Sequence, residues 1–157
     1  MAAVGNGTVT RPRICFFARV ADRQVLDRFE FYAQDIAILT DLGYEVKPVT
    51  RVHQLGPADA YFIWWWTWAF APLALARLLG RPALITGTFD EWRFDQRPGP
   101  HRALMRWALR QADANVFVSQ LEFEAVTARW PVTRPRYIPH VVDTVRYHPG
   151  ARPPDPI

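Results

Sequence analysis

Short apolar runs alternate along this chain with longer segments in which apolar residues recur at helical spacing. Short runs favour buried strands, and the helical spacing favours amphipathic helices. Strands are therefore predicted at residues 14–18, 45–50, 59–66, 82–86, 115–118 and 136–139, and helices at 27–42, 71–79, 101–112 and 121–129. Strands that alternate with helices form right-handed βαβ units. The predicted fold is a Rossmann-like three-layer α/β/α domain with a mainly parallel sheet of about six strands, in the order 3-2-1-4-5-6.

Local signals mark the ends of these elements. Asp27, followed three residues later by Glu30, has the pattern of a capping box, so the first long helix is predicted to begin at Asp27. Gly43 is predicted to end that helix. Pro48 in the second strand lacks an N–H donor, which favours an edge position or a bulge.

The uncharged stretch 60–76 raises the question of a membrane span. Its length lies at the short limit for a helix that crosses a bilayer, and Pro72 interrupts it. The first half is rich in aromatic residues, whereas the second half is rich in Ala and Leu. We therefore predict a buried strand, a short turn and then a helix from about Ala71.

Tryptophans cluster at the end of that strand. Alternation along a strand would place Trp64 and Trp66 on one face and Trp65 on the other. We assign Trp64 and Trp65 to the core. Trp66 and Trp68 are predicted to lie at the carboxyl end of the strand, where they could line a crevice.

The composition suits one globular domain and excludes several classes of protein. Of 157 residues, 50% are hydrophobic and 22% charged, which argues against disorder. The single cysteine, Cys15, excludes an internal disulfide, and four scattered histidines give no support to a Cys/His zinc site. We expect a flexible segment at 1–12, one domain at 13–149 and a proline-rich interdomain linker at 150–157.

Ligands of open α/β sheets bind outside the carboxyl ends of the strands, so the loops that follow the strands are the expected place for binding residues. Neither a dinucleotide-binding glycine pattern nor a phosphate-binding P-loop is present, so no cofactor is predicted. Arg19 and Arg23 could bind an anion, or they could belong to a surface loop with internal ion pairs. Asp90 and Glu91, beside aromatic residues, suit sugar or polyol recognition, although Asp90 could instead cap a helix. Ser119 is expected to cap the next helix.

The cations are almost all arginines, and the formal net charge is +4. Arg102, Arg106 and Arg110 fall on one helical stripe. Plain solvent exposure explains such a stripe, and peripheral contact with anionic lipid is the alternative. No nucleic-acid-binding motif accompanies the charge, so nucleic acid is not a predicted partner.

Several segments resemble a known family when their order and spacing are taken together. Residues 116–119 read Val-Phe-Val-Ser, residues 138–144 read Ile-Pro-His-Val-Val-Asp-Thr, and residues 147–149 read Tyr-His-Pro. With Leu-Gly-Tyr-Glu-Val at 42–46 and Gly-Arg-Pro-Ala at 80–83, this resembles the N-terminal half of retaining GT-B glycosyltransferases of family 4, over residues 13–149. The chain departs from the family at His140-Val141, where Asn-Gly is usual, and at Phe89-Asp90, where His-Asp is common.

The resemblance implies a Rossmann-like acceptor-binding domain of a cytoplasmic, metal-independent enzyme. Such enzymes transfer a sugar with retention from a nucleotide-sugar to a sugar or lipid-linked acceptor. The donor would bind mainly to a C-terminal domain of the same protein, whose paired glutamates eight positions apart this sequence lacks. The acceptor-binding residues expected here are Arg19, Arg23, Trp66, Asp90, Glu91 and Ser119, with no catalytic nucleophile, and the domain alone is expected to be inactive. The alternative is a stand-alone, non-catalytic Rossmann-like binding or interaction module, and the length of the intact gene product would separate the two.

Overall fold

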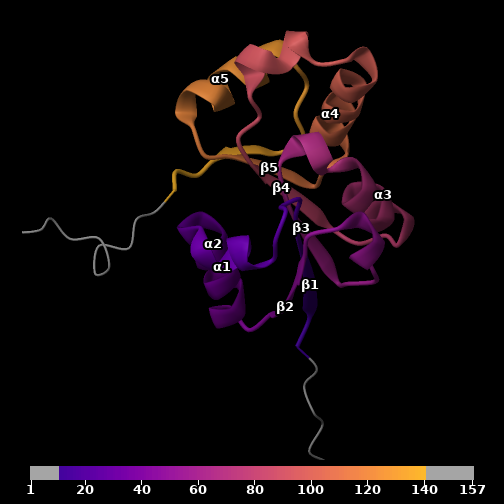
Figure 1. The fold of residues 1–157 in the computed structure, drawn as a ribbon. Helices are drawn as coiled ribbons and strands as arrows, with labels where there is room; N and C mark the ends of the chain where they lie inside the picture. Colours follow the sequence, from indigo (N-terminus) through magenta and orange to yellow (C-terminus); the bar gives the residue numbers. More distant parts are fainter. Residues whose placement is uncertain (1–10, 141–157) are drawn as a thin grey trace, which may run out of the picture.

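A computed structural model describes residues 11–140 of the chain. Figure 1 shows one sheet with helices on both of its faces, so the predicted three-layer α/β fold is confirmed. The six strands are all parallel. They are β1 (Arg13–Ala18), β2 (Glu45–Val49), β3 (Ala60–Trp64), β4 (Ala83–Gly87), β5 (Ala114–Phe117) and β6 (Pro135–Tyr137). The helices are α1 (Gln24–Arg28), α2 (Glu30–Asp41), α3 (Phe70–Leu78), α4 (Gly99–Gln111) and α5 (Gln120–Arg129), with 3-10 turns η1 (Val52–Gln54), η2 (Trp66–Trp68) and η3 (Glu91–Gln96).

The strand order is β2-β1-β3-β4-β5-β6, and the predicted order 3-2-1-4-5-6 is wrong. β2 alone lies on the side of β1 that faces away from β3. The predicted order would have placed two strands on that side. Pro48 within β2 lacks the N–H that a second neighbouring strand would need. The predicted edge position of this strand is therefore confirmed, and the third strand pairs with the free side of β1.

The helical region after β1 begins earlier than predicted and is broken once. α1 starts at Gln24, whose N–H donates to the Asp22 carboxylate at 3.1 Å, and Asp27 lies inside it. Phe29 is extended between α1 and α2. Neither N-cap residue, Arg23 or Phe29, makes a side-chain capping hydrogen bond, so the predicted capping box at Asp27 is wrong. Gly43, with a φ of 90°, follows the end of α2 as predicted.

Two hydrophobic cores lie on opposite faces of the sheet. One contains residues of α3, α4 and α5 packed against the strands, including Leu73, Met105 and Val126. The other contains Leu26 and Tyr32, from α1 and α2, packed on β1 and on the end of β3. Stretch 60–76 forms β3, η2 and α3 as predicted, and no helix among residues 11–140 is long and apolar enough to cross a membrane.

Candidate functional site

The carboxyl edge of the sheet has its topological switch point between β1 and β3, since the chain leaves these neighbouring strands in opposite directions. Arg19, directly after β1, is exposed, and its guanidinium carbon lies 5.4 Å from the ring centroid of Trp68 in η2. Arg51 holds the loop after β1 by donating to the carbonyls of Val20 and Ala21 at 2.7 and 2.6 Å. The structure thus places Arg19 at the switch point, where the sequence predicts a crevice, beside the half-exposed Trp68. Arg23 is an exposed residue at the start of α1.

Trp66 does not line this crevice, which corrects the sequence-based assignment. Trp65 has a φ of 78°, and this left-handed residue ends the alternation of β3. Trp64 and Trp66 consequently belong to the two different cores rather than to one face. The Trp66 indole is 1% exposed and donates to Asn115 Oδ1 at 2.8 Å, so it offers no surface to a ligand.

The loop after β4 is fastened to α5 by a carboxylate that the sequence analysis did not single out. The Asp90 N–H donates to Glu122 Oε1 at 2.7 Å, and Asp90 itself has a φ of 57°. Burial raises the pKa of Glu122 above its ordinary value, and backbone hydrogen bonds from this loop oppose the rise. Ser119 accepts a hydrogen bond from the Glu122 N–H at 3.4 Å, so the predicted cap of α5 is confirmed.

The two acidic side chains of this loop form ion pairs with arginines of the protein. The Asp90 carboxylate lies 3.2 Å from an Arg97 nitrogen, and Glu91 lies 2.7 Å from Arg129. A ligand that contacted either carboxylate would compete with these arginines. The structure brings Asp90, Glu91 and Ser119 together after β4 and β5, and it places Arg19 on the loop after β1.

A cavity of about 230 Å³ lies where α2 meets the carboxyl ends of β3, β4 and β5. Trp64 Nε1 donates to Asp35 Oδ2 at 3.1 Å across its wall. The His140 ring lies parallel to the Trp64 ring, with 5.8 Å between centroids. The cavity is lined by Gln34, Asp35, Ile38, Phe62, Trp64, Leu84, Thr86, Val116, Val118, Ile138, Pro139 and His140.

Burial shifts the pKa of both titratable groups of this cavity. Burial raises the pKa of Asp35 to about 6, although the Trp64 hydrogen bond favours the charged form. Burial lowers the pKa of His140 below its ordinary value. Near neutral pH the Asp35 carboxyl can therefore accept or release a proton, and a neutral His140 ring can accept or donate a hydrogen bond. Perturbed carboxyls in clefts are typical of functional sites.

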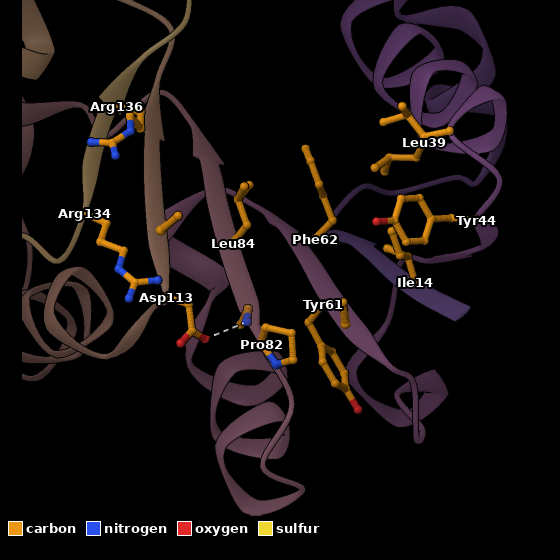
Figure 2. A pocket seen from close by; sticks show the side chains of 14 residues that line it. Ile14, Leu39, Tyr44, Tyr61, Phe62, Pro82, Leu84, Asp113, Arg134 and Arg136 are labelled. Carbon is orange, nitrogen blue, oxygen red and sulfur yellow. Dashed lines mark hydrogen bonds between the residues drawn. The ribbon is translucent and has the colours of Figure 1, made fainter. Parts of the chain in front are cut away.

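A second cavity continues from the first along the sheet face that α2 leaves uncovered. Its volume is about 450 Å³, and both cavities share Phe62 and Leu84. Figure 2 shows Leu39 of α2 on one side of this space, and Arg134 and Arg136 on the other. Apolar side chains of the sheet and of the α2 side form most of its lining, whereas Arg134 and Arg136 make the other side charged.

Metal ligands are not gathered anywhere in residues 11–140, since no three His, Cys, Asp or Glu side chains there are placed to share an ion. Comparison of the chain with protein-family models finds no match, and comparison with curated proteins finds no significant match. Function is therefore inferred from the residues and from their geometry.

Proposed function

We propose that this chain is the acceptor-binding domain of a glycosyltransferase that moves a sugar from a nucleotide-sugar to an acceptor with retention. The observation that carries the proposal is the cavity at the carboxyl edge, in which Asp35, Trp64 and His140 meet. Parallel α/β sheets bind ligands at this edge. The family resemblance described above supports the same role, and the nucleotide-sugar would be held mainly by a second, donor-binding domain.

The cavity has the groups that a hydroxylated acceptor requires. The carboxylate of Asp35 can accept hydrogen bonds from hydroxyls, and the amide of Gln34 can accept or donate them. Phe62 and Ile138 offer apolar surface to a sugar ring. Arg19 beside Trp68 adds a cation and an aromatic face at the neighbouring switch point between β1 and β3. Asp90 and Glu91 enter this proposal only as supports of the loop, because both already pair with arginines.

Titration of the 157-residue protein with methyl glycosides, inositol and glycerol, followed by amide NMR, tests the proposal. At least one of these polyols should shift the amide signals of residues 34–38, 86, 138 and 140, whereas nucleotide-sugars should neither bind tightly nor turn over. Asp35→Asn should weaken the polyol by roughly tenfold or more, because a hydrogen bond to a charged group contributes about 1.5–3 kcal/mol. Asp41→Asn, at an exposed position of the same helix, is the matched control. Turnover of a nucleotide-sugar by the domain alone, or shifts confined to other surfaces, would overturn the assignment.

The uncovered sheet face favours a second candidate, a non-catalytic Rossmann-like binding or interaction module. Parallel sheets are normally covered on both faces, and here an apolar cavity remains open over Phe62 and Leu84. Leu42→Glu would place a charge on the lining of this cavity, at an exposed side chain that does not line the cavity around Asp35. If the chain acts through this face, that change should abolish association with a partner and leave polyol binding at Asp35 intact. The opposite result would favour the transferase role.

A further inference from the structure

Two neighbouring helices carry positive charge without any negative charge. α3 and α4 lie side by side on the sheet face opposite α1 and α2 (Figure 1). Neither helix contains Asp or Glu, whereas together they contain Arg77, Arg102, Arg106 and Arg110. The charge of these arginines is therefore not offset by any acidic side chain of the same two helices.

Two arginines of α4 have no acidic partner among residues 11–140 and can pair with an external anion. Asp95 lies 3.8 Å from Arg102 and 2.7 Å from Arg129, so it offsets the positive charge of these two arginines. Arg106 and Arg110 are exposed and form no ion pair with any residue between 11 and 140. They line a shallow groove of about 350 Å³ together with Trp107.

Large apolar side chains are exposed on the same two helices. Phe70 is 48% exposed and packs on Trp107, with 5.4 Å between ring centroids. Leu78 and Leu104 are 83% and 39% exposed. A surface that combines exposed arginines with Trp, Phe and Leu side chains is typical of proteins that bind in the headgroup region of a membrane. A nucleic acid would use the arginines and aromatic rings but would gain little from exposed leucines.

We propose that the outer surface of α3 and α4, defined by Phe70, Leu78, Leu104, Arg106, Trp107 and Arg110, binds a bilayer that contains anionic lipids. The arginines pair with phosphate groups, and the apolar side chains enter the headgroup layer. Since α3 and α4 lie across the sheet from α2, the cavity around Asp35 stays on the side away from the lipid. Membrane binding on this surface does not depend on the proposed transferase function.

Co-sedimentation of the protein with vesicles tests the proposal. Phosphatidylcholine vesicles that contain about 30% phosphatidylglycerol should bind the protein at low salt and release it at roughly 0.5 M salt, and pure phosphatidylcholine should bind it far less. Arg106→Gln with Arg110→Gln should lower the partition coefficient by roughly 25-fold, since each cation near such a surface contributes about fivefold. Leu78→Ser, at a side chain outside the core, should weaken binding to both kinds of vesicle.

Arg28→Gln with Arg136→Gln removes the same charge from α1 and β6 and serves as the matched control. This control should retain vesicle binding to within about twofold. An equal loss in both double variants would show that net charge alone acts, which overturns the proposal. It is also overturned if anionic vesicles are not bound at low salt, or if a single-stranded oligonucleotide binds more tightly than vesicles at the same salt.

Discussion

Replacing Asp35 by Asn should make the protein more stable at neutral pH and leave its stability at low pH unchanged. Burial raises the pKa of Asp35 to about 6, so the folded protein binds an extra proton that the unfolded chain releases. Stability from this group is present below about pH 4 and is lost as the pH rises through about 6. Asn keeps an oxygen that can accept the Trp64 hydrogen bond, and it cannot ionise.

The size of the effect follows from the same pKa. A rise from an ordinary carboxyl value of about 4 to about 6 corresponds to roughly 3 kcal/mol, and partial exposure of Asp35 reduces the expected gain to about 2 kcal/mol. Urea unfolding of both proteins, followed by circular dichroism at about pH 4 and pH 7.5, measures the difference. Exposed Asp41→Asn should change the free energy of unfolding by less than about 0.5 kcal/mol. A difference between wild type and Asp35→Asn that does not vary with pH would refute the reasoning.

Two further substitutions test how the core supports the site. Asn115 is fully buried and its amide accepts from Trp66, so Asn115→Ala should leave this N–H and one backbone carbonyl unpaired. The expected loss is roughly 2–5 kcal/mol in urea unfolding, and a loss below about 1 kcal/mol would show that water replaces the amide. Gly87 has a φ of 112°, and a Cβ there would lie 3.1 Å from Trp64, so Gly87→Ala should lower stability by about 2–3 kcal/mol. Gly80→Ala, where a Cβ would meet nothing within 4 Å, should cost about 1 kcal/mol by thermal melting. Equal losses at the two glycines would exclude the contact with Trp64 as the cause.

Asp35 shows why part of the candidate site escaped the sequence analysis. Asp35 lies three positions after Tyr32, a spacing that puts it on the apolar, inward face of α2. A carboxylate on an apolar helix face was the signal in the sequence that could have indicated the site. Its partner Trp64 is 29 residues away, and His140 is a further 76 residues along the chain. No short-range pattern encodes the meeting of three such distant residues. The resemblance motif did include His140, but as part of a connecting segment rather than as a wall of a cavity.

Local patterns determined the elements and their parallel arrangement. Alternating strand and helix signals are short-range properties of the side chains, and the right-handed βαβ rule converts them into a three-layer α/β fold. Pro48 likewise placed β2 at an edge, because a missing N–H limits pairing in any context. Only the tertiary structure decided the strand order, the burial of Trp66 and the clamping of Asp90 by Glu122. The burial of Trp66 depends on the left-handed backbone of Trp65. The strand order and the hydrogen bond between Asp90 and Glu122 depend on contacts between residues far apart in sequence, and these contacts stabilise the fold only once the sheet has assembled.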